Sequence, residues 1–214
     1  MGDQVMQTGG MDIGVNVVGS GQVVGTPDLL RISFGVEHLA SDVAAGVAQV
    51  GERTEAVIAA LRGQGVAESQ LGTSAVNVFQ DYKEPNAAPL YRASHTITVR
   101  TKDLAGFGRL LNAAVDAAGN DLTMHGLEFD IEDKTELLTR ARELAFAQAK
   151  SKAEHLAALA GFSLGSVSAI AETHGHAPMT ARSASLGGNF DAGVNIVPGG
   201  LDIQVSLQVH FSWA

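Results

Sequence analysis

The sequence predicts a soluble α+β fold in which antiparallel or mixed sheets pack against helices, in the order ββαββ and then αβαβ. Several segments alternate strictly between apolar and polar residues, which is typical of half-buried strands. Others carry apolar residues every three or four positions and end at glycine, which is typical of amphipathic helices. With 45% hydrophobic and 17% charged residues, the 214-residue chain can bury a substantial core.

The chain opens with two predicted strands. Residues 12–25 form a valine- and glycine-bearing strand, in which Gly19 and Gly21 mark a bulge or a close approach of another backbone. A turn at Pro27 leads into the alternating residues 30–37. Because the connection is short, we expect these two strands to form an antiparallel hairpin.

A helix, two strands and a loop complete the first half. Ser41-Asp42 is a plausible N-cap for a helix that ends near Gly63. Strands are predicted at 73–80 and 91–101, with a proline-bearing loop at 81–90 between them.

The second half alternates helices and strands. A helix capped by Asp103 ends at Gly119, and a strand follows at 121–131. The longest predicted helix spans 133–160 and ends at Gly161, and a strand follows at 166–172.

The expected domain organisation is a single domain over 12–214. It is open to division into two lobes, 12–101 and 102–214, that share one core. Residues 1–11 are expected to be disordered, and 173–199 form a loop longer than compact domains usually contain.

The longest helix carries a ridge of small side chains, which lets a neighbouring element approach closely. The ridge lies either on a sheet of the same domain, as in an ordinary amphipathic helix, or against a second subunit. Its members recur every fourth residue: Ala141, Ala145, Ala149, Ala153 and Ala157.

The last predicted strand, 201–213, alternates without interruption from Leu201 to Trp213. At about 3.3 Å per residue it would be about 43 Å long, whereas typical strands are nearer 20 Å. Its polar face is almost uncharged, and a long uncharged edge favours pairing with another strand. Either the same chain or a second copy must cover it.

One loop contains the residues that most resemble metal ligands. His174 and His176 lie two residues apart, with Glu172 and Met179 nearby. Firm sites use three or four ligands, so a solvated polar loop and a weak metal- or small-ligand-binding module both remain open.

Other catalytic patterns are incomplete. Ser163 lies in a G-x-S-x-G sequence, but a predicted helix precedes it and a strand follows, the reverse of a nucleophile elbow. The glycines near Ser20 lack the spacing and the following helix of a dinucleotide fingerprint. His95 and His125 fall on apolar-facing strand positions, where core histidines are commoner than acid–base groups. We therefore expect no enzymatic activity and no cofactor.

Charge and composition restrict partners and location. A net charge of −9 argues against nucleic acid, because phosphates are neutralised by clustered lysine and arginine. The chain lacks cysteine, which excludes disulfides, and no apolar run is long enough to span a membrane. The start shows no signal peptide, so as it stands the sequence predicts a cytoplasmic protein, or an exported, periplasmic one if this is a processed form.

Taken together, these segments resemble the SIMPL-domain family, which includes bacterial periplasmic immunogenic proteins. The resemblance covers about residues 13–213, and the order and spacing of its motifs carry it. They are Val17-x-Gly19-x-Gly21, Pro27-Asp28, Leu61-x-x-x-Gly65-Val66, Leu71-x-Thr73, Tyr91-x-Ala93, Asp103-Leu104, Ala117-Ala118-Gly119, Phe129, the Ala141–Ala153 series with Lys152, Gly161 and Pro198-Gly199.

The resemblance implies an α+β fold and, as in bacterial members, homo-oligomers that include ring-, channel- or cage-like assemblies. It also implies a structural or stress-protective role without catalytic residues, and usual export to the cell envelope. The resulting hypothesis is a non-enzymatic protein whose main partner is itself.

Overall fold

The computed structural model describes residues 13–81, 88–173 and 199–214, and these form two compact units. The first, the three-stranded unit, contains residues 13–25, 133–173 and 200–214. The second, the five-stranded unit, contains the intervening residues 26–81 and 88–132. The predicted lobe boundary at 101/102 therefore lies inside the second unit.

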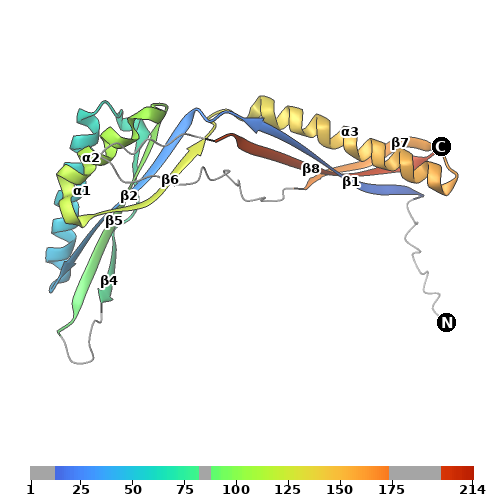
Figure 1. The fold of residues 1–214 in the computed structure, drawn as a ribbon. Helices are drawn as coiled ribbons and strands as arrows, with labels where there is room; N and C mark the ends of the chain where they lie inside the picture. The colour runs from blue at the N-terminus through green and yellow to red at the C-terminus, as the bar shows by residue number, and fades with distance from the viewer. Residues whose placement is uncertain (1–12, 82–87, 174–198) are drawn as a thin grey trace, which may run out of the picture. The chain divides into compact units, whose positions relative to one another are not determined.

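The three-stranded unit is a fully antiparallel sheet with one long helix packed along it (Figure 1). The strand order is β1-β8-β7, so the C-terminal strand is central and β1 and β7 are the edges. Its elements are β1 Gly14–Gly25, α3 Thr135–Ala160, β7 Leu164–Thr173 and β8 Leu201–Trp213.

The five-stranded unit packs two helices on a second antiparallel sheet of order β3-β5-β2-β6, with β4 also paired to β5. The predicted strand 73–80 is in fact two short strands, and both pair with β5. Its elements are β2 Leu29–Ala40, α1 Val43–Gly63, β3 Leu71–Thr73, β4 Asn77–Asp81, β5 Leu90–Thr101, α2 Phe107–Ala118 and β6 Leu122–Asp130.

Two helix ends follow the predicted local chemistry, whereas the predicted cap at Asp103 is wrong, because α2 begins at Phe107 after Gly106 and no side-chain hydrogen bond caps it. Asp42 caps α1, because its carboxylate accepts a hydrogen bond from the Ala45 backbone N–H at 3.0 Å. Gly161 closes α3 in the left-handed conformation, with φ of 75°, which glycine adopts without steric cost. Among the described helices, none is long and apolar enough to cross a membrane.

The predicted hairpin between the first two strands is wrong. β1 pairs with β8, whereas β2 pairs with β5 and β6 in the other sheet. Alternation fixes which face of a strand is buried, but it does not choose the partner strand. The chain passes between the two sheets at residues 26–28.

The long C-terminal strand is paired on both edges by its own chain. β8 aligns with β1 along the whole of β1, from Gly14↔Ser212 to Gly25↔Leu201, and with β7 on its other side. One face is buried by the helix, as the alternation predicted. The buried side chains are Leu201, Ile203, Val205, Leu207, Val209 and Phe211.

The alanine ridge of α3 packs against β1 of the same unit, so the ordinary amphipathic-helix alternative is confirmed. All five ridge alanines are buried. A Cβ added to Gly19 would lie 2.0 Å from the Ala145 carbonyl oxygen, and one added to Gly21 would lie 2.0 Å from that of Ala141. The close approach predicted at these glycines is therefore the contact with the alanine ridge.

The core of the five-stranded unit uses larger side chains. Leu30, Ile32 and Phe34 of β2 are fully buried beneath the helices, together with Val57 of α1 and Leu110 of α2. The predicted disordered segment 1–11 and all of the predicted loop 173–199 except its two end residues lie outside the described residues.

Candidate functional site

The two histidines singled out as metal ligands, His174 and His176, lie outside the described residues. Metal or small-ligand binding by that loop stays a prediction, which titration of Zn²⁺ or Ni²⁺ against a His174→Ala/His176→Ala variant tests. Within the described ranges, no group of three or more His, Cys, Asp or Glu side chains is placed to hold a metal ion.

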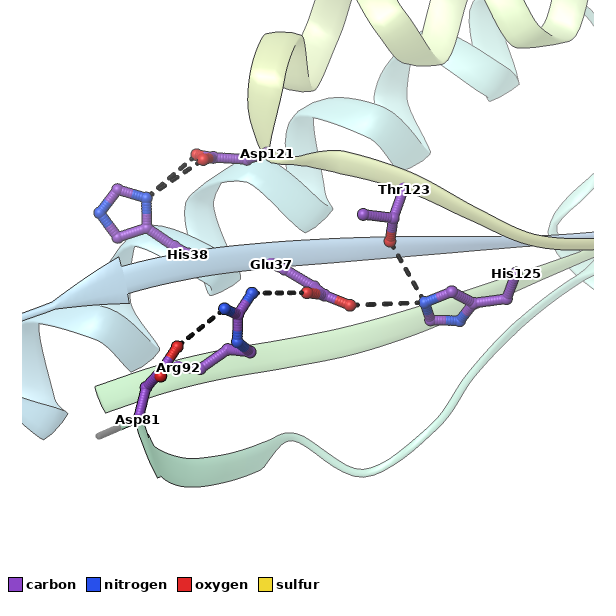
Figure 2. A network of polar contacts seen from close by, with 7 residues as sticks. All are labelled: Glu37, His38, Asp81, Arg92, Asp121, Thr123 and His125. Atoms are coloured by element: carbon purple, nitrogen blue, oxygen red, sulfur yellow. Dashed lines mark hydrogen bonds and ion pairs between the residues drawn. The ribbon is translucent and has the colours of Figure 1, made fainter. Parts of the chain in front are cut away.

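A cluster of charged side chains lies on the five-stranded sheet (Figure 2). Arg92 of β5 donates to the Glu37 carboxylate of β2 at 3.2 Å and to the Asp81 carboxylate of β4 at 2.8 Å. The hydrogen bonds to Asp81 and Glu37 raise the pKa of Arg92 above its ordinary value. Arg92 thus connects three strands by charge-assisted hydrogen bonds.

The same cluster extends to β6. The second oxygen of Glu37 lies 3.6 Å from His125 Nε2, which is also 3.2 Å from the Thr123 hydroxyl (Figure 2). Both side chains lie over Gly35, where an added Cβ would come within 2.3 Å of Thr123 Oγ1 and 2.4 Å of His125 Nε2. The absence of a side chain at position 35 therefore makes room for the pair.

The prediction that His125 is a core histidine is wrong, and a β-bulge explains why. Ser33 pairs with Gly126 and Phe34 pairs with Met124, so His125 is an extra residue on β6. The bulge breaks the alternation that would have turned its ring toward the core. Its side chain is 41% exposed.

His95 differs from its prediction as well, because it is only partly buried. Its Nε2 lies 2.7 Å from the Ser74 carbonyl oxygen, in the connection between β3 and β4.

A second ionic contact joins the sheet to its helices. His38 of β2 lies 3.2 Å from the Asp121 carboxylate (Figure 2). Arg53 of α1 lies 3.9 Å from the same carboxylate. These groups are partly exposed, so each contributes little to stability by itself. In the Arg92 cluster and in the Asp121 contacts, the charged side chains connect neighbouring strands and helices, which is a structural role.

Ser163 is not placed as a nucleophile. It follows the end of α3 and precedes β7, as predicted, and its carbonyl oxygen accepts a hydrogen bond from Ala214 N at 2.9 Å. Sequence reasoning missed a second serine, Ser168, whose hydroxyl bonds His210 Nδ1 across β7 and β8. The two residues are 42 positions apart, so no local pattern signals the contact.

An apolar groove lies between α3 and β7 in the three-stranded unit. Its volume is about 460 Å³, and Phe146, Ile170 and Leu207 supply its apolar lining. Arg142 of α3 crosses it to the Glu172 carboxylate of β7 at 2.8 Å, and this ion pair raises the pKa of Arg142. The groove exists because α3 packs on β1 and β8 and makes few contacts with β7.

The edge strand beside this groove, β7, exposes two large apolar side chains. Ile170 is 56% exposed and Val167 is 41% exposed. Edge strands are commonly protected by lysine, proline or β-bulges. β7 contains neither lysine nor proline, and its two register shifts lie before Ile170, between Leu164 and Ala169. We define the association surface as β7 together with the groove residues Phe146 and Leu207.

Comparison with known proteins gives relatives along most of the chain. The 26 kDa periplasmic immunogenic protein of Brucella melitensis is 28% identical over 170 residues, which cover 74% of this chain and 66% of that protein. The uncharacterized protein YggE of Edwardsiella ictaluri is 29% identical over 165 residues, which cover 73% of this chain and 67% of that protein. The chain thus spans just under two thirds of the Brucella relative.

One solved structure, AtUAH in complex with (S)-hydroxyglycine, matches 59% of this chain and 34% of that chain. The identity is 15% and the TM-score is 0.27.

The SIMPL family, described as a protein of unknown function (DUF541), matches residues 15–213. That range includes α1, α2 and α3 and nearly all of the described strands, and it contains Gly19 and Gly21 of β1 as well as the alanine ridge of α3. The chain is therefore a member of the SIMPL family.

Proposed function

We propose that this SIMPL-family protein is a non-enzymatic module that associates with copies of itself through the association surface, in a structural or stress-protective role. The observation that carries the proposal is the exposed edge strand β7, with Val167 and Ile170 beside an apolar groove. Exposed apolar patches on folded domains commonly mark interaction sites.

A second copy fits this surface for a geometric reason. An antiparallel edge strand can pair with the same strand of another copy about a two-fold axis, because such an interface is self-complementary. Apolar side chains from one β7 would then contact the groove of the other copy.

The electrostatics of the association surface favour the same occupant. The Arg142–Glu172 ion pair, together with Glu143, which also lines the groove, leaves its rim with both signs of charge. Two copies related by a two-fold axis would place each arginine near the partner's carboxylate as well as its own. A strongly one-signed rim would instead repel a second copy.

A structural role agrees with how the charged residues are used. Glu37, Asp81 and Arg92 are engaged with one another across neighbouring strands. These ion pairs hold the strands together, and both carboxylates are bound by the Arg92 guanidinium, which is always charged.

Location is part of the proposal. The Brucella relatives are named periplasmic proteins. We extend that location to this chain, in preference to a cytoplasmic one.

Size-exclusion chromatography with light scattering tests the proposal. The wild-type protein is expected to have the mass of two or more 22.1 kDa chains at micromolar concentration. Ile170→Asp is expected to shift it to the mass of one chain, because a buried unpaired carboxylate is costly at an interface.

Met124→Asp is the matched control, since Met124 is 51% exposed on β6 of the other unit. It is expected to leave the mass unchanged. A wild-type mass of one chain at every concentration would refute the proposal.

A further inference from the structure

The second edge of the three-stranded sheet, β1, differs from β7. β1 contains 12 residues and is an edge in the order β1-β8-β7. Every second residue of an edge strand points its backbone N–H and C=O away from the sheet, toward any further strand. Such a row of groups is a template for pairing with another chain.

Two side chains of α3 occupy these groups in the middle of β1. The Gln148 side-chain oxygen accepts hydrogen bonds from the Ser20 backbone N–H at 2.8 Å and from the Ser20 hydroxyl at 3.2 Å. The Lys152 ammonium donates to the Val18 carbonyl oxygen at 2.8 Å. Val18 and Ser20 are two residues apart, so their outward groups lie along the same edge, where an antiparallel partner strand would need them for its own hydrogen bonds.

The placement of both side chains follows from the packing of α3. Gln148 and Lys152 are four residues apart, so they project from the same side of the helix. The contact of Gly19 with Ala145 and Ala149 brings the helix close enough for both side chains to reach the strand edge. Glycine in β1 and alanine in α3 are thus preconditions for these hydrogen bonds.

We infer that Gln148 and Lys152 form an edge cap that closes β1 to pairing with a strand of a second copy. The inference rests on the proposed function only in naming β7 as the edge that stays open. With one edge capped, strand pairing joins two copies and stops. With both edges open, each copy can accept a partner on either side and the sheet can extend without limit.

The test compares two double variants of the full chain. Gln148→Ala/Lys152→Ala removes the edge cap, and alanine keeps the helix propensity of α3 high. Lys150→Ala/Ser151→Ala is the matched control, because it also removes one lysine and one neutral polar side chain from exposed positions of α3. Gln148→Met/Lys152→Met, which retains the aliphatic stems, guards against a loss of packing and is expected to behave like the first variant.

The first readout is hydrogen exchange at the Ser20 amide. Without the edge cap it is expected to be about fivefold faster than in the control, the factor that corresponds to one net hydrogen bond. Equal rates in the two variants would overturn the inference.

The second readout is a nitroxide spin label on Val18→Cys, whose side chain is 52% exposed near the middle of β1. It is a unique attachment point because the chain has no cysteine. Adjacent strands lie about 4.8 Å apart, so β1 strands paired edge to edge give strong dipolar broadening. Copies joined only through β7 hold the labels five strand spacings, about 24 Å, apart and give little broadening.

Strong broadening, and a mass that exceeds the control's and rises with concentration, are expected only for the two variants that lack the edge cap. Spectra and masses equal to those of the control would overturn the inference. If the wild type is a single chain, the proposed function fails, yet new broadening in the capless variant still supports the edge cap.

Discussion

The two units of this protein have the same kind of architecture, helix on antiparallel sheet, but opposite packing. In the three-stranded unit, glycines of β1 meet buried alanines of α3 at backbone distance. In the five-stranded unit, large side chains such as Leu30, Ile32 and Phe34 fill the space between sheet and helices. The first unit should therefore be sensitive to added volume and the second to lost volume.

The largest expected effect is a deletion in the five-stranded unit. Phe34→Ala empties a fully buried ring site and should lower the free energy of unfolding by about 4 kcal/mol. Urea denaturation measures it. Phe79→Ala is the matched control, because it removes the same ring from a position where that ring is 64% exposed. A loss equal to that of Phe79→Ala would show that this core tolerates cavities.

An insertion in the three-stranded unit follows in size. Ala149→Leu adds volume at a fully buried position against β1 and should cost about 3 kcal/mol. Ala147→Leu makes the same change at an exposed position of α3 and should cost less than about 0.5 kcal/mol. Similar unfolding midpoints for the two variants would contradict the tight-contact description.

A smaller gain is expected from Thr54 of α1. Its side chain is 2% exposed, and among the described residues its hydroxyl has no hydrogen-bond partner. Thr54→Val keeps the shape, removes an unsatisfied polar group and should raise the free energy of unfolding by about 1 kcal/mol. A loss of stability in thermal denaturation would indicate a partner for the hydroxyl.

The smallest expected effect concerns pH at the start of α3. The side chain and backbone N–H of Thr135 donate to Asp133 and lower the pKa of its carboxyl. Because the folded pKa is depressed, this contribution is present above the pKa of the unfolded chain and is lost as pH falls through the folded value. Asp133→Asn should remove this contribution, so the free energy of unfolding of the wild type should fall more steeply than that of the variant between pH 5 and pH 2. Unfolding curves of the two proteins at several pH values measure the difference. An equal fall in both proteins would contradict the prediction.

Local sequence signals predicted the elements well, because they depend on nearby residues. The Asp42 cap, the Gly161 terminus and the alternation of 201–213 each specify their own structure. Partner choice was not predictable in this way. Gly19 and the alanine ridge were recognised as two close-approach signals, but more than 120 residues separate them and no local pattern pairs them.

The polar cluster on the five-stranded sheet could not be predicted for a similar reason. Glu37, Asp81 and Arg92 come from three strands, and His125 is turned outward by a bulge that alternation does not show. The edge cap is likewise a long-range contact, since Ser20 and Gln148 are 128 residues apart.

Gly19 and Gly21 of β1 pack directly against the backbone of α3, and one pair of substitutions tests this contact most directly. Gly21→Ala should lower the free energy of unfolding by about 3 kcal/mol, because the new Cβ would lie 2.0 Å from the Ala141 carbonyl oxygen. Gly51→Ala, in α1 with no atom within 4 Å of the added Cβ, should raise it by up to about 1 kcal/mol. Opposite signs in urea denaturation are the predicted result, and an unchanged or more stable Gly21→Ala protein would contradict the account.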